Sequence, residues 1–300
     1  KDGEIRGDYT AAEFQSLPAE QRDQMGLRPL ELNSLRNIAA PCDRGGDSEW
    51  NIRQFFFAYK HQPETLHIDE AVFPFGGATA IIGHNGAGKS TLLLHLNGLL
   101  EPSSGQVRVG DIPVTPKTVA RVRESVGMVF QQADDQLFMP TVREDVAFGP
   151  LNMGLPPEEV SRRVRQALRD VHAEALADKM THHLSGGEKR AVSIATVLSM
   201  TPDILVLDEP SANLDPASRR TLISLLRQFS HTKIIATHDL DMVMDLCTRC
   251  IVMKDGSILA DAPVPDIFAD CALLEEARLE QPLSYRLMQY GRERENSGQF

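Results

Sequence analysis

Short apolar runs alternate with helical patterns along most of the chain. An apolar run lies at 78–82, and further short apolar or alternating runs lie within 105–110, 124–131, 203–210, 232–239 and 250–263. Between several of these runs, the hydrophobic periodicity predicts helices at 158–171, 188–199, 217–229 and 239–246. Strands that alternate with helices predict an α/β fold with a mainly parallel sheet covered on both faces. The segment 140–183 has no convincing strand pattern, so we predict a mostly helical insertion there.

A glycine-rich loop joins the run 78–82 to a helix predicted at 91–100. Its spacing is Gly83, four residues, and then Gly88, Lys89 and Ser90. Glycines let successive N–H groups point at one spot, where the helix N-terminus adds partial positive charge. The lysine can then reach the β- and γ-phosphates of a nucleotide, and the Ser90 hydroxyl can ligate Mg²⁺. This order of elements favours a phosphate site at the carboxyl ends of the strands over a glycine turn that binds nothing.

Composition narrows the class of protein further. The chain has 300 residues with a net charge of −11, which argues against a nucleic-acid partner because that would need a basic face. It contains no run of eighteen apolar residues that could span a membrane. Four cysteines are too few for a disulfide scaffold, and the lone Cys42 and Cys271 indicate a reducing cytosol. Cys247 and Cys250 form a CxxC, for which structural thiols are favoured over redox or metal chemistry.

Two carboxylates end the apolar run at 204–210, which reads ILVLDEP. At the end of a central strand, Asp208 can hold the Mg²⁺ shell, and Glu209 can orient or deprotonate an attacking water. An acidic turn after a strand is the alternative, and the phosphate loop upstream favours the functional interpretation. His238 follows another predicted strand, where it suits a contact with the γ-phosphate or the attacking water. A polar loop residue is the alternative for this histidine.

A second glycine pair opens the helix predicted at 188–199, within the sequence LSGGE. Ser185, Gly186 and Gly187 offer N–H groups and a helix N-terminus to an anion. One nucleotide has a single triphosphate, and the first loop already holds it. The second anion site therefore suggests a composite site shared between two chains, although an ordinary N-cap with a glycine turn is the alternative.

Taken in order, these segments resemble the ATP-binding-cassette (ABC) ATPases from about residue 51 to residue 263. The resemblance implies a RecA-like P-loop NTPase core with a small antiparallel β part and a helical subdomain. It also implies hydrolysis of ATP with Mg²⁺, in which Glu209, His238 and Gln131 are catalytic and Ser90, Gln131 and Asp208 hold the metal. The resemblance assigns nucleotide contacts to Tyr59, Gly83, His84, Asn85, Gly86, Ala87, Gly88, Lys89, Ser90, Thr91, Ser185, Gly186, Gly187, Glu188 and Asp215.

The same resemblance implies a head-to-tail pair of cassettes. Each ATP would lie between the phosphate loop of one chain and residues Ser185 to Glu188 of the other. Tyr59 would stack on adenine, although the neighbouring aromatics at 55–57 could equally form a core. Gln131 would contact Mg²⁺ and sense the γ-phosphate.

A narrower resemblance covers residues 129–156, with DDQLF followed by EDVAFGPLN. This segment is similar to the cobalt and energy-coupling-factor importers, although Gln132 stands where that subgroup often has asparagine. The resemblance implies a peripheral subunit on the cytoplasmic face of the cell membrane. Its partners would be an integral membrane coupling protein and a separate membrane component that binds the substrate. Cobalt, nickel and vitamins stay open as substrates.

The N-terminus carries a weak internal repeat. Residues 1–14 align with 254–268 around a shared KDG, for which chance similarity is the alternative. We predict that 1–32 is the tail of a preceding cassette, 33–50 a linker, 51–263 the ATPase domain and 264–300 a C-terminal extension. The helical subdomain is expected at about 132–185. The partner cassette is then either a second copy of this chain or the preceding half of a tandem protein.

Two other classes of function compete with a transport ATPase. A soluble ABC ATPase of DNA repair or translation usually has a coiled-coil insertion or a basic arm, and the cassette segment here has neither. A regulatory module that binds nucleotide without hydrolysis is the other alternative. Glu209 and His238 are both present, which favours a site that is competent for hydrolysis.

Overall fold

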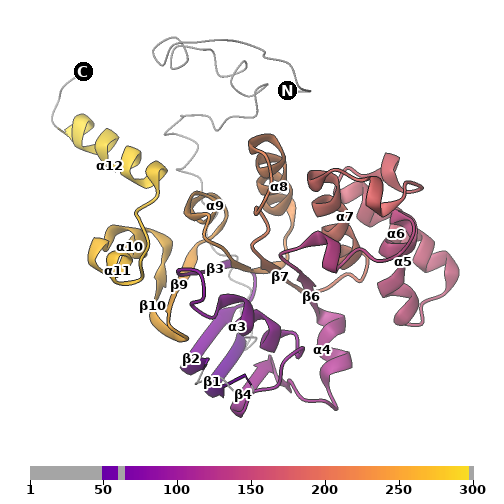
Figure 1. Ribbon diagram of the computed structural model, residues 1–300, viewed down its shortest axis with the longest axis horizontal. Coiled ribbons are helices and arrows are strands. Elements are labelled where there is room, and N and C mark those ends of the chain that lie inside the picture. Colours follow the sequence, from indigo (N-terminus) through magenta and orange to yellow (C-terminus); the bar gives the residue numbers. More distant parts are fainter. Residues whose placement is uncertain (1–48, 60–64, 297–300) are drawn as a thin grey trace, which may run out of the picture.

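Two β-sheets organise the chain in the computed structural model, which describes residues 49–59 and 65–296 (Figure 1). The larger sheet has six strands in the order β10-β9-β3-β8-β7-β6, and all neighbours are parallel except β10 and β9. The strands are β3 (Ala78–Ile82), β6 (Val126–Val129), β7 (Ile204–Asp208), β8 (Thr232–Ala236), β9 (Arg249–Lys254) and β10 (Ser257–Pro263). The mainly parallel sheet predicted from the sequence is confirmed.

The central strands are apolar without alternation because both faces of the sheet are covered. Every residue of β3, β7 and β8 is buried, as expected for a parallel sheet between two layers. Ala80 and Ile82 pack with the helices on one face, whereas Ile81 packs into a second core on the other face. The helices α3 (Lys89–Leu96), α8 (Pro216–Gln228) and α9 (Leu240–Leu246) directly follow β3, β7 and β8, and α7 (Gly186–Leu198) precedes β7.

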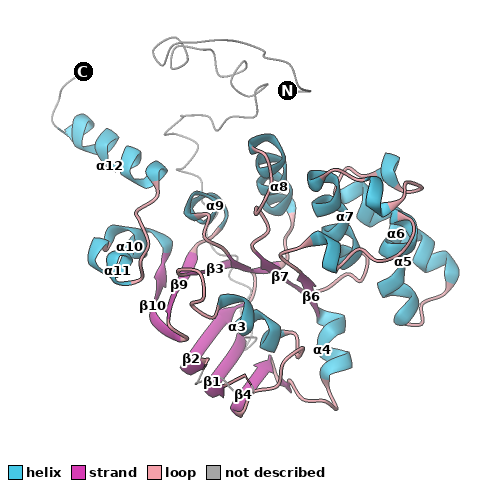
Figure 2. Cartoon of the chain, in the orientation of Figure 1, coloured by secondary structure: helices cyan, strands magenta, loops and turns pink. Residues whose placement is uncertain are grey.

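A four-stranded antiparallel sheet covers the face of the large sheet that carries α3 (Figure 2). Its order is β2-β1-β4-β5, and the bounds are β1 (Glu49–Phe57), β2 (Leu66–Pro74), β4 (Ser104–Val109) and β5 (Ile112–Pro113). The buried residues Leu66, Ile68 and Phe73 of β2 pack against α3. This sheet is the small antiparallel β part that the family resemblance implied.

Helices fill the segment between β6 and α7 and form a separate lobe (Figure 1). Within it lie η2 (Ala133–Asp135), α5 (Val142–Asn152), α6 (Pro157–Asp170), η3 (Glu174–Leu176) and η4 (Thr181–His183). Within 140–183 the only β pairing recorded is the isolated bridge between Thr141 and Met180. The helical subdomain of the predicted fold class is therefore present.

The remaining helices are α4 (Val119–Ser125), α10 (Val264–Ala269), α11 (Cys271–Glu276) and α12 (Leu283–Asn296). The last three make up the described part of the predicted C-terminal extension. None of the helices within 49–59 and 65–296 is both long and apolar enough to cross a bilayer.

The boundaries of several predicted segments differ from the structure. The helix expected at 91–100 spans Lys89–Leu96, because the backbone of Gly98 is left-handed at φ 63° and ends it early. The predicted tail at 1–32 and most of the linker at 33–50 lie outside the described residues. The final two linker residues belong to β1, since Glu49 and Trp50 pair with the end of β2.

Candidate functional site

The glycine-rich loop runs from the end of β3 to the start of α3, as predicted. Gly88 has φ 100°, and a Cβ there would lie 2.5 Å from Leu66 Cδ2, so only glycine fits. Gly86 has φ 86° and faces open space, since an added Cβ would meet nothing within 4 Å. The turn between β9 and β10 supports the loop, because the Gly256 N–H donates to the Ala87 carbonyl at 3.1 Å. The loop therefore packs closely against Leu66 and the β9–β10 turn, and it is open on the side of Gly86.

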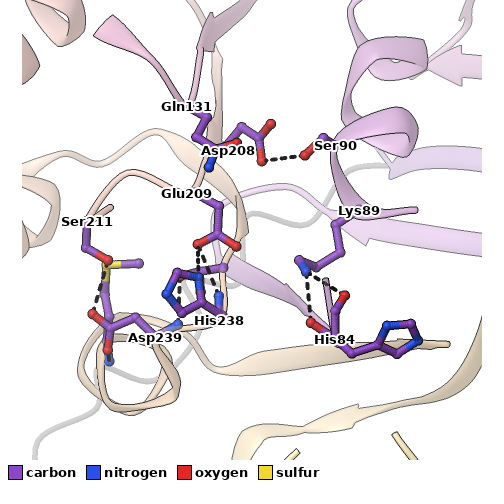
Figure 3. A network of polar contacts seen from close by, with 12 residues as sticks. His84, Lys89, Ser90, Gln131, Asp208, Glu209, Ser211, His238 and Asp239 are labelled. Carbon is purple, nitrogen blue, oxygen red and sulfur yellow. Dashed lines mark hydrogen bonds and ion pairs between the residues drawn. The ribbon is translucent and has the colours of Figure 1, made fainter. Parts of the chain in front are cut away.

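Lys89 is folded over this loop. Its Nζ donates to the carbonyl oxygens of Gly83 at 2.8 Å and His84 at 3.2 Å (Figure 3). Burial lowers the pKa of Lys89, while the nearby Glu209 and Asp208 carboxylates act in the opposite direction. The lysine thus presents a cation at the loop, where a phosphate would supply the missing anionic partner.

Ser90 and Asp208 meet where the phosphate loop faces the end of β7. The Ser90 hydroxyl donates to Asp208 Oδ1 at 3.1 Å. Burial raises the pKa of Asp208, and the hydrogen bond from Ser90 opposes that rise. Gln131 follows β6, and the register of Val129 with Leu207 brings it to the same edge (Figure 3). Hydroxyl, carboxylate and amide oxygens suit Mg²⁺, so these three residues fit the predicted metal.

Glu209 and His238 form a pair at the neighbouring strand ends. His238 Nδ1 lies 2.8 Å from Glu209 Oε2, and the His238 backbone N–H donates to the same oxygen at 3.2 Å. Glu209 has a left-handed backbone with φ 41°, which is strained for a residue with a Cβ. Its own N–H donates to the Ala236 carbonyl at 2.8 Å, which anchors the strained turn to β8. The sequence predicted each residue as catalytic, but it gave no sign of their direct contact.

A partly buried ion pair fixes the loops next to Glu209 and His238. Arg219 of α8 donates to both carboxylate oxygens of Asp239 at 2.5 and 2.7 Å, and the Ser211 hydroxyl donates to Asp239 at 3.1 Å. Burial acts to raise the pKa of Asp239, but the hydrogen bonds and charge of Arg219 outweigh it, and the net shift is downward. Asp239 also caps α9, directly after His238. Sequence reasoning missed this pair.

The LSGGE segment forms the N-terminus of α7, on the helical lobe. Ser185 and Glu188 make a capping box, in which each side chain accepts a backbone N–H of the other. Lys179 also lies 3.3 Å from Glu188. Gly186 faces open space, whereas a Cβ at Gly187 would meet the Ser218 hydroxyl at 2.7 Å. These residues contact the lobe and α8, and their contact with a nucleotide stays a prediction.

Two other predicted nucleotide contacts have local partners in the structure. Asp215 caps α8 by accepting the N–H groups of Ala217 and Ser218, and the Ser218 hydroxyl lowers the pKa of this aspartate most. The Tyr59 hydroxyl lies 3.4 Å from Thr91 Oγ1, and its ring meets Phe57 edge-on. Tyr59 is therefore next to the phosphate loop, and adenine stacking on it stays a prediction.

Comparisons with known proteins agree with this geometry. Residues 69–212 match the family model described as ABC transporter. The chain is 63% identical over 233 residues to an ABC transporter ATP-binding protein from Geobacter sulfurreducens, covering 78% of this chain and 94% of that protein. It is 45% identical over 234 residues to the energy-coupling factor transporter ATP-binding protein EcfA1 of Methanospirillum hungatei, covering 77% of this chain and 84% of the relative.

Solved structures give the same result. The chain is similar to CbiO1 from Clostridium perfringens, part of the ABC transporter complex CbiONQ, with a TM-score of 0.69 and 39% identity, covering 81% of this chain and 100% of that one. It is also similar to a dimeric ATP-binding cassette in a post-hydrolysis state, bound to ADP and Pi. That match has a TM-score of 0.65 and 26% identity, covering 72% of this chain and 98% of the other.

Proposed function

This chain belongs to the ATP-binding cassette family of transporter ATPases, and from that premise we propose that it powers an importer of the energy-coupling-factor type. Its substrate class, its membrane partners and the roles of individual residues belong to this proposal. In such a system the chain is peripheral, on the cytoplasmic face of a membrane. A separate membrane component selects the solute, which leaves cobalt, nickel and vitamins as candidate cargoes.

At the phosphate loop, the chain's own residues supply charge and positioning. Lys89 neutralises the β- and γ-phosphates of ATP, and the loop N–H groups bind their oxygens. Ser90, Asp208 and Gln131 would hold Mg²⁺, which supplies charge neutralisation at the transferred phosphoryl group when bound. Glu209 lies at the adjacent strand end, where its carboxylate can orient a water and accept its proton. His238 holds that carboxylate at 2.8 Å and fixes its direction.

A second cassette would complete the site. The free face of Gly186 and the N-terminus of α7 offer N–H groups and partial positive charge to an anion. Within one chain the phosphate loop and the start of α7 belong to different parts of the fold (Figure 1). The dimeric cassette structure among the similar proteins supports a pair of cassettes. In the pair that we propose, each α7 faces the partner's ATP.

An exposed aromatic pair on the helical lobe carries the importer proposal. Phe138 is 61% exposed, Leu151 is 57% exposed, and the rings of Phe138 and Phe148 meet edge-on with centroids 4.8 Å apart. The buried Asp145 fixes this surface by accepting the N–H groups of Phe138 and Met139 at 3.2 and 3.1 Å. Exposed apolar side chains on this fixed stretch of backbone suit the apolar face of a partner helix, such as that of a coupling protein.

The proposal is tested by binding of the full chain to its membrane coupling protein in detergent. We expect Phe138→Ala to weaken the complex about tenfold or more, because buried aromatic anchors dominate such interfaces. Hydrolysis of ATP by the chain alone should stay unchanged. Leu99→Ala is the matched control, since Leu99 is an exposed apolar residue on the other part of the fold. Equal binding by Phe138→Ala and wild type would contradict the proposed docking surface.

A further inference from the structure

Arg190 of α7 holds the backbone of the Gln131 segment. This buried side chain donates through Nη1 to the Phe130 carbonyl at 2.7 Å and through Nη2 to the Gln131 carbonyl. Burial lowers the pKa of Arg190, and the negative charge of Asp208 opposes that shift. A guanidinium is rigid and planar, so one side chain fixes two consecutive carbonyls at a set spacing. A neutral donor such as a hydroxyl would satisfy only one of them.

The rest of the segment is fastened to the same helix. Gln136 donates through Nε2 to the Ser193 carbonyl and to Thr196 Oγ1, both at 2.7 Å, and its Oε1 accepts the Phe130 N–H at 3.2 Å. These contacts join residues 130–136 to α7 from its first turns to its last. The segment that carries Gln131 is therefore attached to α7 as well as to the end of β6.

The position of Arg190 on α7 connects the start of this helix with Gln131. It lies five residues after Ser185, which corresponds to about 8 Å along a helix. A displacement of the start of α7 therefore reaches Gln131 through one rigid helix and one side chain. In a pair of cassettes, the start of α7 faces the partner's nucleotide, whereas Gln131 faces the nucleotide on its own phosphate loop.

We propose that Arg190 is a positioning residue that fixes Gln131 to α7, so that nucleotide bound at one composite site sets the position of Gln131 at the other. The coupling half of this inference rests on the proposed pairing of cassettes. The attachment of Gln131 to α7 rests on contacts within one chain. The two halves are therefore tested separately.

The first test is amide hydrogen exchange on the full, nucleotide-free chain. Arg190→Met should speed exchange in peptides spanning 130–136 by about tenfold or more, since local opening sets exchange rates. Peptides from α5 should not change. Arg190→Lys keeps a cation but cannot donate to both carbonyls at the fixed spacing of a guanidinium, so it should give an intermediate exchange rate. Lys189→Met is the control, because Lys189 pairs at 2.6 Å with the exposed Asp134 of the same segment without holding its backbone.

The second test measures ATP hydrolysis against ATP concentration together with binding of a fluorescent ATP analogue. Wild type should hydrolyse with a Hill coefficient near two, the number of sites; Arg190→Met should fall toward about one, and Arg190→Lys should lie between the two. Binding of the analogue to isolated chains should change less than about twofold, since Arg190 has no assigned nucleotide contact. Lys189→Met should behave as wild type in both assays.

The exchange and hydrolysis experiments can each refute a different part of the proposal. Unchanged exchange at 130–136 in folded Arg190→Met and Arg190→Lys would show that Arg190 does not position Gln131. Faster exchange with an unchanged Hill coefficient would refute the coupling and leave the positioning role. A wild type that hydrolyses without cooperativity would also refute the coupling, because paired but independent sites give a Hill coefficient of one, while the exchange experiment would still decide the role of Arg190.

Discussion

The partly buried pair of Arg219 and Asp239 should contribute more stability than an exposed arginine–aspartate pair. The two side chains are only 23% and 17% exposed, and the guanidinium spans both carboxylate oxygens. Arg219→Met leaves a partly buried carboxylate without its cation, so we expect a loss of about 2 kcal/mol in the free energy of unfolding, less than for a fully buried pair. Arg219→Lys cannot span both oxygens and should lose less.

The chain offers a matched control. Arg143 lies 2.8 Å from Asp178, but those side chains are 50% and 85% exposed. Arg143→Met should therefore cost less than about 1 kcal/mol, because water screens and replaces the lost interaction. Urea unfolding of both variants at pH 7, followed by circular dichroism, gives the two values. Equal losses would refute the argument that burial makes the Arg219 pair strong.

The pH dependence follows from the lowered pKa of Asp239. The stabilisation is fully present above 3.8, the ordinary aspartate value, and is lost as the pH falls through the lower pKa of the folded state. In Arg219→Met the hydrogen bonds and charge of the guanidinium are lost, so the pKa of Asp239 rises relative to wild type and the pH-dependent stabilisation becomes smaller. The difference between wild type and variant should therefore shrink on acidification. A difference that is constant down to the acid transition would show that charge is not its cause.

Three further predictions concern the site and the thiols. Glu209→Gln should bind ATP but hydrolyse it at least about 100-fold more slowly in a phosphate-release assay, and near-normal turnover would refute its role as base. Gly88→Ala should destabilise the fold by about 1–3 kcal/mol in thermal unfolding, because of φ 100° and the 2.5 Å approach to Leu66, and wild-type stability would contradict this. Iodoacetamide followed by mass spectrometry should label exposed Cys271 but leave Cys247 unmodified in the native protein, since burial raises the pKa of Cys247 to about 12; rapid labelling of Cys247 would contradict its burial.

The parallel sheet and the phosphate loop could be predicted because their signals are local in sequence. The runs at 78–82, 203–210 and 232–239 are apolar because strands buried on both faces require it. The loop combines glycines, a lysine and a hydroxyl within eight residues. The helix ends were predicted less well, since a capping box starts α7 at Gly186, two residues before the predicted start.

The residues that orient the site could not be predicted. Arg190 contacts carbonyls 59 and 60 residues earlier in the chain, and Arg219 contacts an aspartate 20 residues later. A single arginine on a helix surface has no sequence signature, because only the tertiary fold selects its partner. The contact between Glu209 and His238 is hidden for the same reason, although both residues stand at predicted strand ends.

The arrangement of strands has a consequence for synthesis on the ribosome. The phosphate loop lies in the first third of the chain, but its strand β3 pairs with β8 and β9, and its backbone is held by Gly256. A nascent chain that ends before β9 has the loop sequence but lacks one of the two strands that pair with β3 and the turn that supports the loop. The emerging polypeptide should therefore gain affinity for nucleotide only after the turn that follows β9 has left the ribosome.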